Sequence, residues 1–168
     1  MKNIKFSRLF AALMVVACLA LAGCSQPEDE TKVKEVTIYG TWEDDYTGYN
    51  TYGKYDSKIT YDYIETASYG KQEGPLYVKM ISENAGYIYY QFSTNVTVYG
   101  PAPDYETSIV NSKGKWGAVA FKDLTDKSVK MCDFADPSKE FPATLEECIS
   151  KYTVEKNYFT YMPEWTKK

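Results

Sequence analysis

The chain has 168 residues, a formal net charge of −4 and no histidine. This length suits one domain with its own core, and the lack of histidine removes the commonest general base and metal ligand. Its only arginine is Arg8, which argues against bidentate phosphate recognition and nucleic-acid binding by the rest of the chain. We therefore expect no catalytic centre, metal site or cofactor.

The first 23 residues have the pattern of a signal peptide. Lys2, Lys5 and Arg8 precede an apolar run at 9–21, which is shorter than the ~20 residues that span a bilayer. The run ends in Leu21-Ala22-Gly23-Cys24, which resembles the bacterial lipobox. That resemblance implies that residues 1–23 are removed and that acyl chains on Cys24 anchor the protein in a membrane. Ser25 resembles the pattern for export to the outer membrane.

The mature chain divides into a tether and a domain. Residues 24–34 are polar and charged and contain a proline, which predicts a flexible, lipid-bearing tether. Residues 35–168 are then the folded domain. Once the three basic residues of the leader are removed, 16 basic and 23 acidic side chains remain, a net charge of −7.

Alternation of apolar and polar residues predicts β-strands through most of the domain. All 17 tyrosines lie between Tyr39 and Tyr161, and this richness also favours β-structure. Residues 43–56 read as a loop or hairpin, and 115–123 is apolar on both faces. The predicted strands are 36–42, 57–66, 76–81, 87–93, 96–99, 105–111, 115–123 and 127–134.

One short helix is predicted near the C-terminus. Thr144 and Glu147 have the spacing of a capping box, and Leu145, Cys148, Ile149 and Tyr152 then share one helical face. A final strand is expected at 158–162, ended by Pro163. About eight strands with close turns predict a mainly β fold, an antiparallel up-and-down barrel or, as the alternative, a sandwich.

Gly40-Thr41-Trp42 resembles the Gly-x-Trp signature of lipocalins, in which the Trp closes one end of an eight-stranded barrel. The mature chain also resembles small lipocalin-like lipoproteins of host-associated bacteria through this tripeptide and through 115–134 and 144–159. The resemblance implies a lipocalin-like barrel. Lipocalins usually pair the Trp with an Arg near the last strand, and usually place the helix after the closing strand, whereas this chain has no such Arg and ends in a predicted strand.

Cys132 and Cys148 are the cysteines that remain once Cys18 leaves with the leader and Cys24 is acylated. If Val129 and Met131 face the core, Cys132 points outward, and Cys148 lies on the apolar face of the helix. A helix laid across the outside of strand 127–134 would bring the two sulfurs together. We predict a disulfide, which the cell envelope permits, the alternative being two unpaired thiols.

The interior of the predicted barrel is aromatic. Strand alternation directs eight large side chains inward: Trp42, Tyr61, Tyr63, Met80, Tyr90, Phe92, Phe121 and Met131. They either fill the barrel or line a pocket for a small hydrophobic or aromatic ligand.

Two functions follow from these alternatives. The first is a membrane-anchored binding protein for that ligand, and the second is a surface lipoprotein with a filled barrel. The Tyr-rich loop of the second, residues 44–55, would contact a protein or a glycan.

An enzyme ranks third. Ser68-Tyr69-Gly70-Lys71 matches the Ser-x-x-Lys pattern of penicillin-recognising enzymes, but their partner motifs are absent. The acidic pairs Asp44/Asp45 and Asp133/Asp136 lack the dense oxygen-ligand spacing of a calcium loop and are read as solvated turn residues.

Overall fold

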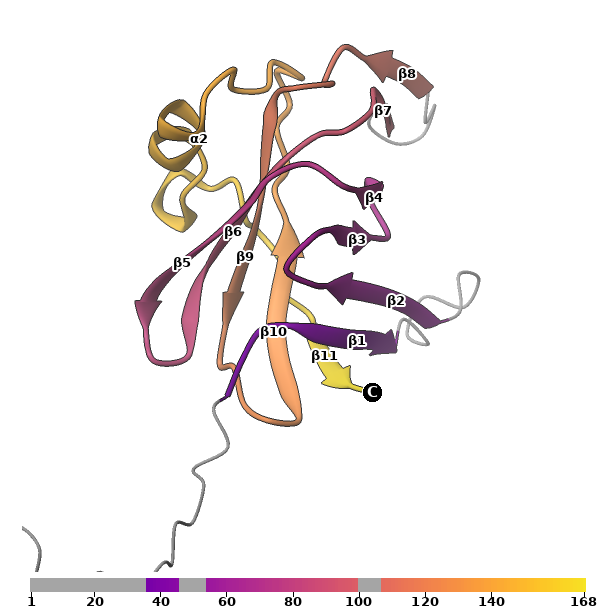
Figure 1. Ribbon diagram of the computed structural model, residues 1–168. Coiled ribbons are helices and arrows are strands. Elements are labelled where there is room, and N and C mark those ends of the chain that lie inside the picture. The colour runs from indigo at the N-terminus through magenta and orange to yellow at the C-terminus, as the bar shows by residue number, and fades with distance from the viewer. Residues whose placement is uncertain (1–35, 46–53, 100–106) are drawn as a thin grey trace, which may run out of the picture. The chain divides into compact units, whose positions relative to one another are not determined.

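Antiparallel strands dominate the part of the chain that the computed structural model describes, which is residues 36–45, 54–99 and 107–168 (Figure 1). The predicted mainly β, antiparallel fold with one α-helix near the C-terminus is confirmed for these residues. The leader, Cys24, the tether and residues 46–53 of the Tyr-rich loop lie outside them.

Nine strands form one sheet, in the order β4-β3-β2-β1-β11-β10-β9-β6-β5. Their bounds are β1 (Gly40–Asp45), β2 (Lys54–Ile59), β3 (Ile64–Thr66), β4 (Gly70–Gln72), β5 (Leu76–Ser82), β6 (Ala85–Gln91), β9 (Trp116–Lys122), β10 (Ser128–Asp133) and β11 (Glu164–Lys167). A separate hairpin pairs β7 (Val96–Tyr99) with β8 (Thr107–Val110). Between β10 and β11 lie the helix α2 (Leu145–Lys151) and the 3-10 helix η2 (Val154–Lys156).

Neighbouring strands of the large sheet follow one another in the chain, apart from the β7–β8 insertion, and the first strand pairs with the last. Hydrogen bonding leaves β4 and β5 as the two edges, so the ladder does not close into the predicted barrel. Residues 73–75 connect these edges. At this corner the Ser93 N–H donates to Gln72 Oε1 (2.9 Å), and the Gln91 N–H donates to the Pro75 carbonyl (3.0 Å).

Four of the predictions about strands are corrected. Residues 57–66 form two strands because Thr60 closes a turn, in which Tyr63 N–H donates to Thr60 Oγ1 (3.0 Å). The predicted strand at 158–162 is wrong. Phe159 instead packs on Tyr87 of β6, with ring centroids 5.6 Å apart, and the last strand begins after Pro163. The first strand begins at Gly40 rather than at residue 36, and the short β4 was not predicted.

Both faces of β6 and β9 are buried. On the inner face Ile88 pairs with Val119, and Phe121 pairs with Met131 of β10. The outer face carries small or aromatic side chains that are also buried, namely Tyr87, Tyr89, Ala118 and Ala120, and α2 packs mainly over these two strands. Burial on both sides accounts for the doubly apolar pattern of the predicted strand 115–123.

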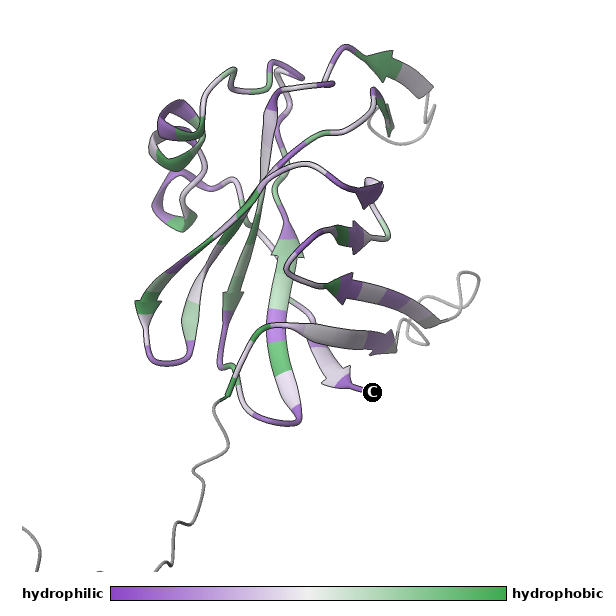
Figure 2. Cartoon of the chain, in the orientation of Figure 1, coloured by the Kyte–Doolittle hydropathy of each residue, from purple (hydrophilic) through white to green (hydrophobic). Residues whose placement is uncertain are grey.

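The strands β1 to β4 form a more polar half of the sheet. They run across the direction of β6, β9 and β10 in Figure 1, and β2 and β4 are largely hydrophilic in Figure 2, whereas β9 is largely hydrophobic. Their inward positions include four buried polar residues, Asp44, Ser57, Thr66 and Gln72. The core is therefore apolar around β6, β9 and β10 and mixed around β1 to β4.

Candidate functional site

An open groove lies beside the β7–β8 hairpin, and we refer to it below as the groove. Its walls come from the β3–β4 turn (67–69), from β7 (97–98) and from the loop 134–141 that follows β10, and it encloses about 650 Å³. Ligand pockets of small molecules have volumes of roughly 300–1,000 Å³. The groove therefore has room for a small organic ligand.

Aromatic rings form the floor of the groove. The ring of Tyr69 stacks on Phe134 (5.2 Å, 18°), and Phe134 meets Phe141 edge to face (5.4 Å, 82°). Tyr152 packs behind Phe134 at 4.4 Å. Gly117 of β9 allows this close packing, because a Cβ there would lie 2.9 Å from Phe134 Cε1. The rings are thus held against the backbone of the sheet.

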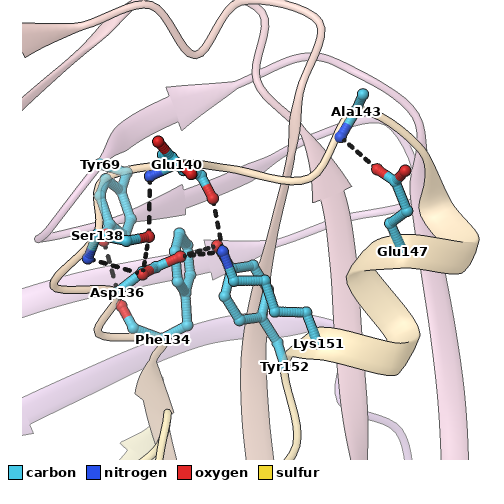
Figure 3. A network of polar contacts seen from close by, with 9 residues as sticks. All are labelled: Tyr69, Phe134, Asp136, Ser138, Glu140, Ala143, Glu147, Lys151 and Tyr152. Carbon is cyan, nitrogen blue, oxygen red and sulfur yellow. Dashed lines mark hydrogen bonds and ion pairs between the residues drawn. The ribbon is translucent and has the colours of Figure 1, made fainter.

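Asp136 ties the loop 134–141 to the helix (Figure 3). Its Oδ1 accepts hydrogen bonds from the N–H (3.0 Å) and Oγ (2.7 Å) of Ser138, and its Oδ2 accepts from the hydroxyl of Tyr152 (2.8 Å). Lys151 Nζ lies 2.7 Å from the same Oδ2, and the Asp136 side chain is 1% exposed. Burial alone would raise the pKa of Asp136, but the hydrogen bonds from Lys151, Ser138 and Tyr152 outweigh it and the pKa is lowered.

Further contacts fix both ends of this loop, as Figure 3 shows. Tyr69 donates its hydroxyl to the Phe134 carbonyl (3.2 Å), and Lys151 donates to the Glu140 carbonyl (2.6 Å). The predicted capping box is confirmed: Glu147 N–H donates to Thr144 Oγ1 (3.2 Å), and the Glu147 carboxylate accepts from Thr144 N–H (3.3 Å). The wall of the groove is therefore anchored to α2 at several points.

The interior of the sheet holds a much smaller space, which we call the interior cavity. It is lined by Ile59, Ile64, Val119 and Trp165 among others, and has a volume of about 20 Å³. A space of this size holds about one water. Side chains therefore fill the region in which the sequence suggested a ligand pocket.

Asp133 lines this interior cavity. Its Oδ1 is buried without a hydrogen-bond partner among the described residues. Burial raises the pKa of Asp133 to about 6, against the opposing effect of side-chain hydrogen bonds from Ser68 and Thr66. The hydroxyl of Tyr90 is also buried without a described partner, and burial, followed by the charge of Asp133, raises the pKa of Tyr90 well above its ordinary value. The filled interior therefore still contains unsatisfied polar groups.

The eight predicted pocket residues divide into three groups. Five are at most 3% exposed: Trp42, Tyr90, Phe92, Phe121 and Met131. Tyr61 and Met80 are 78% and 48% exposed, so the prediction that they face inward is wrong. Tyr61 lies in the turn after β2, and Met80 lies near the end of the edge strand β5. Tyr63 is half-buried, with Lys71 Nζ 4.5 Å from its ring centroid.

Trp42 is fully buried, and its Nε1 donates to the Ile38 carbonyl (2.8 Å). Lys167 of the last strand places its Nζ 5.0 Å from the centroid of the Trp42 ring. A Cβ on Gly40 would lie 2.8 Å from Lys167 Cε, and Gly40 has a φ of +153°. A cation from the last strand thus covers the Trp, although the chain has no arginine there.

The predicted disulfide is wrong, because Cys132 and Cys148 are both free thiols. α2 packs mainly on β6 and β9 rather than across β10, and Cys148 Sγ donates to the carbonyl of Gly117 (3.6 Å). Cys132 lies on β10 opposite Ala120. Burial raises the pKa of each thiol to about 12, so both stay protonated and unreactive at neutral pH.

The residues of the Ser-x-x-Lys match have different partners. Ser68 lines the groove and hydrogen-bonds Asp133, whereas Lys71 forms an ion pair with Glu73. The floor of the groove was not predicted, because Tyr69 and Phe141 belong to a turn and a loop, and Phe134 was placed in the predicted strand 127–134, which ends at Asp133. The sequence did contain one signal. Two phenylalanines, Phe134 and Phe141, lie on either side of Asp136-Pro137-Ser138, a turn-forming segment in which aromatic residues are not expected.

Within the described ranges, no three acidic or cysteine side chains lie close enough together to hold a metal ion. No helix in the same ranges has the length and apolar character needed to cross a membrane. Comparison with protein-family models, with curated proteins and with solved structures found no match to this chain.

Proposed function

We propose that this chain is a lipid-anchored binding protein that holds a small apolar or aromatic ligand in the groove. The observation that carries the proposal is the difference between two volumes. The groove over the rings of Tyr69, Phe134 and Phe141 has a volume of about 650 Å³, whereas the interior cavity has about 20 Å³. Binding sites are typically concave and mostly apolar with a few polar groups, and the groove has this composition. The ligand is thereby assigned to the groove and not to the space between the inward-facing side chains.

We further infer that the sheet is a lipocalin-like barrel with one unpaired seam between β4 and β5. The order of the strands supports this, because β1 pairs with β11 and the two edge strands are joined by only residues 73–75. Lys167 also supports the comparison with lipocalins. Its ammonium lies over the Trp42 ring and supplies the positive charge that an arginine near the last strand usually supplies in lipocalins. In this interpretation the groove lies at one end of the barrel, because Phe134 of its floor packs against Gly117, which shares a face of β9 with the inward-facing Val119 and Phe121.

The binding proposal is tested with N-phenyl-1-naphthylamine, an uncharged aromatic probe whose fluorescence rises in apolar surroundings. The probe should saturate a single site on the soluble domain. Ala135→Trp places a large ring at an exposed position of the groove wall and should abolish binding without lowering Tm. Asp126→Trp, at an exposed turn between β9 and β10, is the matched control and should bind normally. Absence of binding, or equal binding by Ala135→Trp, would contradict the proposal.

Membrane anchoring rests on Leu21-Ala22-Gly23-Cys24 after a short apolar run. Cells that express the full chain should incorporate labelled palmitate into it, and Cys24→Ala should remove the label and release the protein from the membrane fraction. Cys18→Ala, within the leader, is the matched control and should leave labelling unchanged. Label that persists in Cys24→Ala would rule out this anchor.

A filled interior also favours the second candidate function, a surface protein that contacts its partner through exposed tyrosines. Tyr61 is 78% exposed, and its ring lies 4.1 Å from that of Tyr39. The probe experiment separates the two candidates, because a protein of this second kind requires no ligand in the groove. For that function, Tyr61→Ala should weaken partner binding while probe binding is absent.

A further inference from the structure

We propose that the ligand of the groove is an anion, an apolar or aromatic molecule that carries a carboxylate or sulfonate, and that Lys139 contacts its charge. This inference rests on the proposed function and adds the chemical class of the ligand. It follows from the charged side chains that line the groove, which are Asp136 and Lys139.

Asp136 is not available to a ligand. Its two oxygens already accept from the N–H and hydroxyl of Ser138, from Tyr152 and from Lys151, at 2.7–3.0 Å. A carboxylate offers about four acceptor positions, and these four partners occupy them. Lys151 also neutralises its charge, so the one acidic side chain among the described residues of the groove wall neither attracts a cation nor repels an anion strongly.

Lys139 is in the opposite situation. It is half-buried, and its Nζ donates to the hydroxyl of Ser108 on β8 (3.0 Å), which is a neutral acceptor. No carboxylate of the described residues forms an ion pair with it. An ammonium has three donors, so two remain for a ligand. The groove therefore combines an aromatic floor with one positive charge that no described acid compensates.

The backbone of Lys139 supports a specific role for its side chain. It has a φ of +57°, and its N–H donates to the Asp136 carbonyl (3.1 Å). Side chains rarely adopt this left-handed region, where Gly, Asn and Asp are the usual residues. The other described non-glycine residues with positive φ are Asp123 and Asn157, which are of the tolerated types. A lysine at such a position carries a conformational cost, and contact with an anion would account for its presence.

The net charge of the domain explains why an anionic ligand would need a local cation. Residues 24–168 carry a net charge of −7, so the domain as a whole repels anions. Preference for an anionic ligand would therefore have to come from a local group, and Lys139 is the cation that lines the groove.

The test compares two probes with the same ring system, N-phenyl-1-naphthylamine and its sulfonated relative 8-anilinonaphthalene-1-sulfonate. The wild-type domain should bind the sulfonate more tightly, and Ala135→Trp should block both probes. Lys139→Gln should weaken the sulfonate by about tenfold, as expected for the loss of one hydrogen bond between charged groups, and leave the neutral probe unchanged. Lys139→Arg should retain the preference for the sulfonate.

Two further variants keep the result interpretable. Lys139→Gly removes the side chain at a φ that glycine adopts freely, so it should fold and should show the same loss as Lys139→Gln. Lys113→Gln removes one charge from an exposed position outside the groove and should change neither affinity. If the neutral probe binds but neither Lys139 variant alters the binding of the sulfonate, the inference is wrong and the proposed function stands. If neither probe binds, both fail.

Discussion

The groove and the interior cavity have similar walls and very different volumes. Both are bounded by apolar and aromatic side chains, yet one encloses about 650 Å³ and the other about 20 Å³. The interior is full because large residues such as Trp42, Tyr90 and Phe121 converge from strands that face one another. The wall of the groove is instead a loop, 134–141, which is tied to α2 through contacts of Lys151 with Asp136 and with the Glu140 carbonyl. Space for a ligand is thus set by how a loop is supported, not by how many large residues point inward.

Two aspartates three residues apart show the same contrast at the level of single groups. The carboxylate of Asp136, at the groove, is fully hydrogen-bonded and its pKa is lowered. The carboxylate of Asp133, at the interior cavity, has a buried Oδ1 without a described partner, and its pKa is raised to about 6. Ionised Asp136 stabilises the fold, whereas ionised Asp133 destabilises it. Substitutions at Asp136 and at Asp133 therefore test the two regions separately.

The largest effect is expected from Asp136→Ala. This change leaves the Tyr152 hydroxyl and the partly buried Lys151 ammonium without their acceptor, and should lower the free energy of unfolding by about 4 kcal/mol. Urea denaturation at pH 7 measures it. The loop 134–141 should also loosen, so N-phenyl-1-naphthylamine binding should weaken. Asp136→Asn, which keeps an acceptor oxygen, is the matched control and should cost less. A loss below about 1 kcal/mol would mean that this network does not support the wall.

The next largest effect is expected at Asp133, where a substitution should raise the stability of the fold and not lower it. Because its pKa is about 6 in the folded protein and about 4 in an unfolded chain, the folded state binds the proton more tightly. Stability from this group is therefore greatest below pH 4, and about 3 kcal/mol is lost in total as the pH rises from there through 6. Asp133→Asn should remove this fall and be more stable than wild type at pH 8.

The experiment is urea denaturation of both proteins between pH 4 and 8. Asp126→Asn, at the exposed turn between β9 and β10, is the control and should follow the wild-type curve. Parallel curves for wild type and Asp133→Asn would show that the interior carboxylate is solvated, which would weaken the contrast with Asp136.

Much of the fold could be predicted from local patterns, and most of the candidate site could not. The run in 115–123 that is apolar on both faces and the alternation in 127–134 predicted β9 and β10, and Thr144 with Glu147 predicted the start of α2, because strand patterns and helix caps are local signals. The split at Thr60 depends on a turn that the hydroxyl and backbone of Thr60 close through several hydrogen bonds to Asp62 and Tyr63.

The disulfide prediction failed because which strand a helix covers is a tertiary property. The groove depends on three segments distant in sequence, namely 67–69, 97–98 and 134–141. Segment 97–98 belongs to a strand, whereas 67–69 is a turn and 134–141 is a loop, and no local rule connects the three.

The smallest expected effect concerns the end of the sheet near Trp42. Gly40→Ala introduces a Cβ 2.8 Å from Lys167 Cε at a φ of +153°, and should lower the free energy of unfolding by about 1–2 kcal/mol. The added Lys167→Ala change should restore part of this loss, because it removes the close contact and leaves the backbone cost.

Gly114→Ala separates the two causes, since Gly114 also has a positive φ (+81°) but a Cβ there meets no atom within 4 Å. Its loss of stability comes from the backbone alone, whereas the loss in Gly40→Ala should include a further part that Lys167→Ala restores. Binding of N-phenyl-1-naphthylamine should be unchanged in Gly40→Ala, because neither Gly40 nor Lys167 lines the groove. If the variant instead loses the probe while remaining folded, the two regions are coupled, and ligand binding depends on the Trp42 end of the sheet as well as on the groove.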